Sequence, residues 1–258
     1  MFNLQFKIDP KLGDVFTESE NVILLSALNG NGVFGDICNL LSNSESGIIL
    51  SDSNFIYPLG KVSVPRNMPD DFSGILGRTA NVQKIVKGKN WLVMDKIFAK
   101  LSVDKHDLFD NNDLLREDIE ICLVGNESQL KDYCDLKGAF IFEESQETLD
   151  PKKIYSSLKR SYLYLRPALL FCKGQAVGMI SSNFYSSKGA MINLLFIKKE
   201  FRRRGLGKVL LKWYIKSLSE ISNNIYLFYS SDNLSAKRLY GELGFQEIDN
   251  WIMALKNR

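Results

Sequence analysis

The stretch FIKKEFRRRGLGKVLLKWY, residues 196–214, connects an apolar run to an amphipathic segment. It holds three consecutive arginines at positions 202–204 and two glycines, Gly205 and Gly207. A hydrophobic core has no use for three adjacent cations, and glycine costs stability in the interior of a helix. The stretch therefore predicts a strand that ends near Ile197, a turn, and a helix that begins near Gly205.

The predicted helix start has the properties of a site for a diphosphate. The first amides of a helix have no acceptor within the helix and carry partial positive charge. Glycines at 205 and 207 remove the Cβ atoms that would keep a ligand away from the backbone. Because the flanking arginines and lysines add positive charge, this turn is predicted to bind a pair of phosphates.

Composition places the chain among ordinary globular proteins. It has 258 residues, of which 45% are hydrophobic and 24% are charged, and its formal net charge is +3. This charge is too small to indicate binding to nucleic acid or to an anionic membrane, so neither partner is predicted. No apolar run reaches the ~18 residues of a membrane span, and the first ten residues lack the apolar core of a signal peptide.

The cysteines and the single histidine do not indicate a metal site. Cys38, Cys122, Cys134 and Cys172 form no C-x-x-C pair, and His106 is the only histidine. Neither the number nor the spacing suits a zinc site, so no metal cofactor is expected. We interpret the cysteines as reduced residues in or near the core, which predicts a cytoplasmic protein.

The polar stretch at residues 102–120 is the predicted boundary between two domains, residues 1–117 and 118–258. The smaller N-terminal domain is predicted to be mixed α/β, with a helix, a hairpin, a helix and a strand at residues 17–28, 47–60, 78–88 and 89–101. Its segment GNGVFG, residues 30–35, matches G-x-G-x-x-G, and Asp52 follows at the spacing of a ribose-binding acid. Because the residues before it have helical rather than strand character, we interpret the segment as a glycine-rich loop.

The second domain shows a sharper pattern. A helix is entered through Asp150 as cap and Pro151 at its first position, and Pro167 stops it. The other predicted elements are a helix within residues 123–145, three strands within 168–197, an amphipathic helix at 206–221, a strand at 223–231, a helix at 233–244, and one or two strands at 246–255.

Two segments of the sequence resemble those of a known family. Arg202-x-x-Gly205-x-Gly207 is similar to the acyl-CoA-binding signature Q/R-x-x-G-x-G/A of the GNAT N-acetyltransferase superfamily, which follows an apolar strand and opens a helix. The family's second element is a strand, an Asn and a helix that carries a Tyr and ends in Gly-Phe. The segment YLFYSSDNLSAKRLYGELGF, residues 226–245, resembles it. The resemblance covers roughly residues 119–255, with Lys199 where many members have Pro.

The resemblance implies the fold class. It predicts an α/β (mixed α+β) protein whose C-terminal domain has the GNAT fold, a central, mostly antiparallel twisted sheet flanked by helices. The N-terminal domain loosely resembles the degenerate, non-catalytic first domain of two-domain acetyltransferases. Such a domain would shape the cleft for the acceptor.

The resemblance also implies where acetyl-CoA binds. Backbone amides of residues 203–208 would hold the diphosphate, and the strand end at 195–197 would bond to pantetheine and offer a bulge amide to the thioester carbonyl. The side chain of Asn233 would bond to the cofactor, or cap a helix, or do both. The predicted acyl-CoA-binding residues are Leu195, Phe196, Ile197, Arg202, Arg203, Arg204, Gly205, Leu206, Gly207, Lys208 and Asn233.

Tyr240 is the catalytic residue that the resemblance implies. The family's Tyr at this position protonates the leaving thiolate, and a phenol with a pKa of ~10 is protonated at neutral pH. The alternative interpretation is an aromatic residue on the core face of a helix.

The general base stays open. Some relatives carry a Glu five residues before the Asn, where this chain has Phe228. The candidates are Glu143, Glu144, Tyr229, Asp232 and an ordered water. Because a lysine-like amine with a pKa of ~10.4 needs far more help to lose its proton than an α-amino group near ~8, the missing carboxylate favours a low-pKa acceptor or a relayed base.

The sequence therefore predicts an acetyl-CoA-dependent N-acetyltransferase that transfers an acyl group directly to a primary amine in a ternary complex. The alternative is a CoA-binding regulatory or interaction module without turnover. The chain is expected to be a monomer or a homodimer. The identity of the amine and the length of the acyl chain are not determined, since acceptor sites in this fold come from variable loops.

Overall fold

The structure is a computed structural model that divides into two compact units. Unit 1 comprises Met1–Leu101 and Tyr226–Arg258, and unit 2 comprises Ser102–Ile225. Both ends of the chain thus contribute to unit 1, whereas the sequence predicts consecutive domains, and the boundary at residue 117 stays a prediction. The residues that the structure describes are 16–28, 39–44, 47–51, 55–62, 72–103, 118–146 and 148–256.

The strands of unit 1 lie beside one another in a sheet. Their bounds are β1 (Asn39–Ser44), β2 (Gly47–Ser51), β3 (Phe55–Gly60), β4 (Gly74–Arg78), β5 (Trp91–Ser102), β10 (Asn224–Ser230) and β11 (Gln246–Lys256). Their order is β1-β2-β3-β4-β11-β5-β10. β3 and β4 pair in parallel, and the pairs β1–β2, β2–β3, β4–β11 and β5–β11 are antiparallel.

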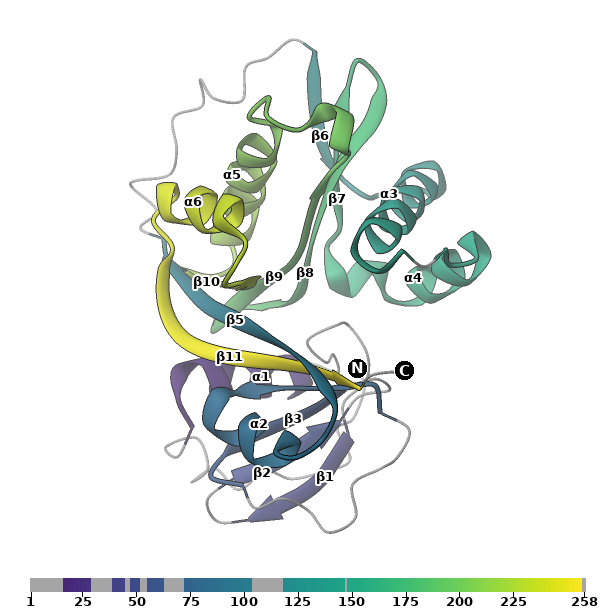
Figure 1. The fold of residues 1–258 in the computed structure, drawn as a ribbon. Helices are drawn as coiled ribbons and strands as arrows, with labels where there is room; N and C mark the ends of the chain where they lie inside the picture. The colour runs from purple at the N-terminus through teal and green to yellow at the C-terminus, as the bar shows by residue number, and fades with distance from the viewer. Residues whose placement is uncertain are drawn as a thin grey trace. The chain divides into compact units, whose positions relative to one another are not determined.

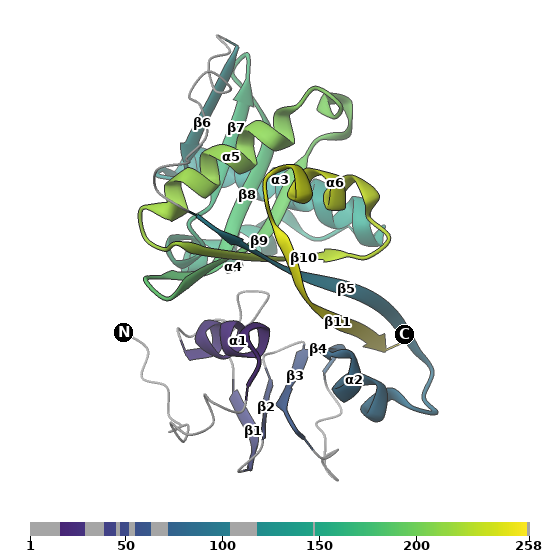
Figure 2. The ribbon, with the colours of Figure 1, turned by 90° about the vertical axis from the view of Figure 1, so that its left-hand side faces the viewer.

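β11 is a central strand of unit 1, although it comes last in the described chain. It lies between β4 and β5, where Trp251 faces Arg78 on one side and Lys96 on the other; Figures 1 and 2 both show it beside β5. The indole of Trp251 is fully buried and contacts the rings of Phe98 and Phe228. Aromatic packing therefore ties a late segment of the chain to an early one.

The helices of unit 1 are α1 (Glu18–Leu28), α2 (Thr79–Val86) and α6 (Leu234–Glu242). At the start of α1, the amide of Thr17 donates to Glu20 Oε2 at 3.0 Å, and the amide of Glu20 donates to Thr17 Oγ1 at 3.4 Å. This reciprocal pair is a capping box, which satisfies two amides of the first turn. Thr17 is thus the N-cap of α1.

Unit 2 holds a four-stranded antiparallel sheet with helices on both faces. Its elements are β6 (Ile119–Leu123), α3 (Glu127–Ser145), α4 (Pro151–Leu165), β7 (Ala168–Cys172), β8 (Gln175–Ser186), β9 (Gly189–Ile197) and α5 (Leu206–Ser219). The strand order is β9-β8-β7-β6, and neighbouring strands pair antiparallel. Figure 1 shows α3 and α4 on one face of this sheet and α5 on the other.

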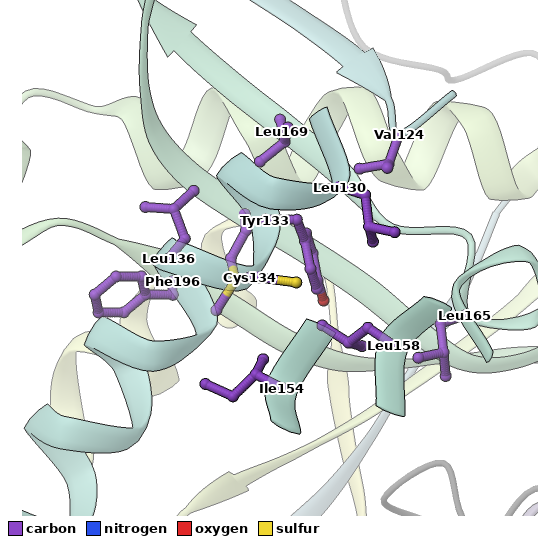
Figure 3. Packing of buried hydrophobic residues seen from close by; sticks show 11 residues of the cluster. Val124, Leu130, Tyr133, Cys134, Leu136, Ile154, Leu158, Leu165, Leu169 and Phe196 are labelled. Atoms are coloured by element: carbon purple, nitrogen blue, oxygen red, sulfur yellow. The ribbon is translucent and has the colours of Figure 1, made fainter. Parts of the chain in front are cut away.

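The core of unit 2 fills the space between α3, α4 and the sheet. Figure 3 shows this cluster, in which the Cys134 thiol lies among apolar side chains. Its desolvation raises the pKa of Cys134 to about 11, so the thiol stays protonated at neutral pH. The buried members are Val124, Leu130, Tyr133, Cys134, Leu136, Ile154, Leu158, Leu165, Leu169, Met179 and Phe196.

The helix signals in the sequence are confirmed. The carboxylate of Asp150 accepts from the Lys152 amide at 2.9 Å, and Pro151 is the first residue of α4. On α5, the predicted amphipathic helix buries one face, formed by Leu206, Leu210, Tyr214 and Leu218. The segment at residues 30–35, Asp52, Cys38 and His106 lie outside the described residues.

Candidate cofactor-binding and catalytic residues

The loop between β9 and α5 begins with a short 3-10 turn, η3 (Lys199–Phe201). The Lys198 amide donates to the Val177 carbonyl of β8 at 2.9 Å, and the Phe201 amide donates to the Lys198 carbonyl at 2.9 Å. β9 therefore ends at Ile197, where the sequence predicts the end of the strand.

Two residues of this loop have left-handed backbone conformations. Arg203 and Gly205 lie in the left-handed region with φ values of 60° and 77°, whereas Arg202 has a φ of −70°. A left-handed residue with a side chain costs roughly 1–2 kcal/mol, so the loop holds strain at Arg203.

The first turn of α5 follows directly. The first amide to reach a carbonyl four residues back is that of Val209, which donates to Gly205 at 3.1 Å. The amides of Leu206 and Gly207 precede it, in the turn where a helix supplies no carbonyl four residues back. Together with the helix dipole, these amides offer positive potential to an anion.

The two glycines of the signature have different reasons to be glycine. Gly205 needs its left-handed φ, although a Cβ there would meet nothing within 4 Å. A Cβ added at Gly207 would find Ile197 Cγ1 as its nearest neighbour, at an ordinary 3.8 Å. Since the protein itself leaves room at both positions, the missing side chains leave the backbone of this turn open to a ligand.

The three arginines are placed differently. The side chain of Arg202 bonds to the Ile197 carbonyl and to Glu143. Arg204 donates to the Glu200 carbonyl at 3.1 Å. Arg203 is exposed. The run of three cations in the sequence is therefore not a single cationic patch of equivalent side chains.

The end of β9 is bound to β8 through its backbone. Residues 195–197 pair with Ile180, Met179 and Gly178 in that order. The register shifts just before them, because Ser181 faces 194 and Ser182 faces 192, which leaves residue 193 as an extra residue of a bulge. The side chains of residues 196 and 197 are buried, so any role in binding falls to their backbone.

Asn233 caps α6. Its Oδ1 accepts from the Ala236 amide at 3.0 Å, and the side chain is exposed. The capping role that the sequence left open is therefore present in the structure. The bond uses the amide oxygen of the side chain.

Tyr240 lies on α6 in an aromatic environment. Its ring centroid is 5.4 Å from that of Tyr229 and 5.7 Å from that of Phe245. Desolvation by burial raises the pKa of Tyr240 to about 12. The phenol is therefore protonated at neutral pH, as a proton donor must be.

Two of the candidate bases are engaged elsewhere. The bond from Arg202 lowers the pKa of the Glu143 carboxyl, which weakens it as a base. Burial, together with the bond to Glu247, raises the pKa of Tyr229 above its ordinary value, so that it does not ionise near neutral pH. Glu144 and Asp232 are exposed.

The position of the family's carboxylate is occupied by an aromatic residue. The Phe228 ring lies 4.5 Å from that of Phe98 and 5.3 Å from that of Trp251, both edge-on. Phe228 thus packs within unit 1 and offers no group that could take a proton.

The predicted residues fall into two groups by unit. The strand end at 195–197 and the loop at 202–208 belong to unit 2, where one leads into the other. Asn233 and Tyr240 belong to unit 1, at the start and on the body of one helix. Within the described ranges, no three His, Cys, Asp or Glu residues gather as metal ligands would, and no helix is long and apolar enough to span a membrane.

Comparison with known proteins decides the family. The sequence model described as "Acetyltransferase (GNAT) family" matches residues 132–245. The chain is also 30% identical over 138 residues to the N-alpha-acetyltransferase 30 of Dictyostelium discoideum, covering 51% of this chain and 70% of that protein. The chain belongs to the GNAT acetyltransferase family. The predicted class of enzyme, an acyltransferase, is thereby confirmed at the level of the family.

The chain is also similar to a second curated protein and to a solved structure. A probable spermine N(1)-acetyltransferase of Bacillus subtilis subsp. natto is 34% identical over 92 residues, covering 32% of this chain and 60% of that protein. The chain thus spans about three fifths of the length of that GNAT relative. A GCN5-related N-acetyltransferase-like protein from Streptococcus suis has a TM-score of 0.61 at 15% identity, covering 95% of this chain and 96% of that one. This likeness confirms the predicted fold class.

Proposed function

We propose that the chain transfers an acetyl group from acetyl-CoA to a primary amine, by direct transfer in a complex that holds both substrates. The observation that carries the proposal is the loop at residues 202–208. It combines left-handed backbone at Arg203 and Gly205 with the amides of the first helical turn that precede Val209. A helix start of this kind favours an anion, and it lies at the position of the family's acyl-CoA signature.

Each predicted group has a step in the proposed reaction. The amine nitrogen attacks the thioester carbonyl carbon, and a backbone amide from the end of β9 stabilises the oxyanion. The N–C bond forms as the C–S bond breaks, and the CoA thiolate takes the phenolic proton of Tyr240, which regains one from solvent. The surplus proton of the amine leaves to water or to a base. Asn233 contributes a side-chain bond to the cofactor.

The acceptor is proposed to be an amine that needs little help to lose its proton. Phe228 stands where some relatives have a carboxylate, and Glu143 and Tyr229 are engaged in bonds of their own. An α-amino group with a pKa near ~8 is neutral far more often at pH 7.4 than an alkylamine near ~10.4, a difference of about 3 kcal/mol. The names of the relatives supply both kinds of amine for a test.

The test measures thiol release from acetyl-CoA with spermine and with a peptide that has a free α-amino group, and identifies the product by mass spectrometry. Calorimetry with CoA runs in parallel. Turnover with acetylated amine supports the proposal, and a higher kcat/KM for the peptide supports the acceptor class. CoA binding without turnover on either amine would identify a binding module instead, and absence of CoA binding would refute both.

A further inference from the structure

The guanidinium of Arg202 is held by three bonds within unit 2. Its Nε donates to the carbonyl oxygen of Ile197, the last residue of β9, at 2.8 Å. Its two terminal nitrogens contact the two carboxylate oxygens of Glu143 at 2.6 and 2.7 Å. A planar fork that meets a carboxylate in this bidentate way is stronger and more directional than a single contact.

Glu143 comes from the C-terminal half of α3, far from Arg202 in sequence. α3 also contacts the end of β9 through aromatic rings, since the Phe140 ring lies edge-on 5.9 Å from that of Phe196. The guanidinium carbon of Arg202 is 5.5 Å from the centre of the Phe196 ring. The ion pair and the ring contacts thus join α3, the end of β9 and the start of the loop.

These contacts conflict with a role for Arg202 as a mobile cation for phosphate. Three of its five N–H donors are used, and its charge is balanced by Glu143. Arg203, the next residue, is exposed and bears the same charge. Both arginines are exposed, and they are a matched pair because the side chain of Arg202 is bonded to Ile197 and Glu143.

We propose that Arg202 is a positioning residue, which with Glu143 fixes the start of the loop to the end of β9 and to α3. In this role Glu143, an anion, supports the binding of an anionic ligand, because it holds the loop in its binding shape. The inference rests on the proposed binding of CoA by this loop.

The decisive experiment compares Arg202→Met, Glu143→Gln and Arg203→Met by calorimetry with CoA over a range of salt concentrations. For Glu143→Gln, simple electrostatics and positioning predict opposite signs. Removal of a negative charge near a diphosphate should tighten binding if Arg202 were a phosphate ligand. We expect the Kd for CoA to rise about threefold to tenfold instead, the scale of one partly exposed ion pair with an added hydrogen bond.

The other variants sharpen the comparison. Arg202→Met should match Glu143→Gln in size, and the double variant should be no worse than either single one, because both remove the same anchor. Arg202→Met should stay close to the wild-type salt dependence of CoA binding, because Glu143 already balances the charge of Arg202. Arg203→Met should reduce that dependence, because it would remove a cation that contacts phosphate. Tighter CoA binding by Glu143→Gln, or a lower salt dependence in Arg202→Met, would overturn the proposal.

A second readout does not need the ligand. Hydrogen exchange of the amides at residues 198–204 should be faster in Arg202→Met and Glu143→Gln than in wild type, and unchanged in Arg203→Met. If wild type fails to bind CoA, the proposed function is wrong, and this measurement still decides the anchor. Unchanged exchange in all three variants would refute it.

Discussion

The rings of Tyr229 and Tyr240 lie against each other, with centroids 5.4 Å apart and planes inclined by 52°. The hydroxyl of Tyr229 donates to Glu247 Oε1 at 2.5 Å, and Lys237 approaches the same oxygen at 3.1 Å. The ring of Tyr229 therefore packs against Tyr240, whereas its hydroxyl bonds to a residue of β11. This arrangement separates the two tyrosines chemically, because the hydroxyl of Tyr229 is bonded to a carboxylate, whereas that of Tyr240 is proposed to donate a proton in the reaction.

Tyr240→Phe should lower kcat by about 10²–10⁴-fold, the usual contribution of a general acid, and leave the Kd for CoA unchanged. The substitution keeps the ring and its packing against Tyr229 and Phe245. Steady-state kinetics and calorimetry measure the two effects. Tyr155→Phe is the control, since its hydroxyl bonds to Glu127 on the surface of unit 2. Full activity in Tyr240→Phe would remove Tyr240 from the mechanism.

Tyr229→Phe should change kcat by less than about threefold, because its hydroxyl serves Glu247 and the ring contact with Tyr240 is kept. The cost should appear in stability, at about 1 kcal/mol or less for a hydrogen bond to a partly exposed carboxylate. Urea denaturation measures that cost. A fall in kcat as large as that of Tyr240→Phe would instead make Tyr229 a base.

The pH profile should reflect the shielding of Tyr240. The phenol acts in its protonated form, and desolvation raises its pKa to about 12. Activity that depends on this proton is therefore fully present below the ordinary phenol value of ~10 and is lost only as the pH rises toward the raised value. We expect kcat to show no alkaline fall centred near pH 10. An alkaline limb at that pH in wild type, absent in Tyr240→Phe, would contradict the predicted shielding.

Gly205→Ala and Gly207→Ala should change stability in opposite directions. Alanine at 205 must adopt a φ of 77°, which costs roughly 1–2 kcal/mol. Alanine at 207 stands in the first turn of α5 with space around its Cβ, and there it gains up to about 1 kcal/mol of helix propensity. Denaturant titrations compare the two. Equal effects would show that backbone handedness does not explain Gly205.

Substitutions of Asn233 can separate its role as the cap of α6 from its proposed bond to the cofactor. Asn233→Ala loses the bond to the Ala236 amide and should cost about 1 kcal/mol, whereas Asn233→Ser can still cap α6 and should cost only a few tenths. If the side-chain amide also binds cofactor, both variants should raise the Kd for CoA. A normal Kd in Asn233→Ser would leave only the cap.

Local signals in the sequence predicted the elements that have local causes. Asp150 and Pro151 start α4 because a carboxylate and a residue without an N–H suit the first turn. The end of β9 and the start of α5 followed from an apolar run that stops at an arginine-glycine turn. These features depend on a few adjacent residues, which is why the sequence alone could locate them.

Features that depend on distant partners were not predicted. β4 (Gly74–Arg78) contains two glycines, so its strand character comes from pairing with β11 rather than from its own residues. The bond of Arg202 to Glu143 joins positions 59 residues apart. Nothing in the spacing marks such a pair, and from the sequence the arginines were expected only to add positive charge to the turn.

The place of β11 between β4 and β5 bears on how the protein is made. A ribosome releases β4 and β5 long before it releases β11. Until β11 is made, the edge of each strand that will pair with it has no partner. Exposed edges of this kind invite wrong partners on a nascent chain. Completion of unit 1 therefore depends on the synthesis of β11, and termination before that strand would leave the aromatic core of the unit open to solvent.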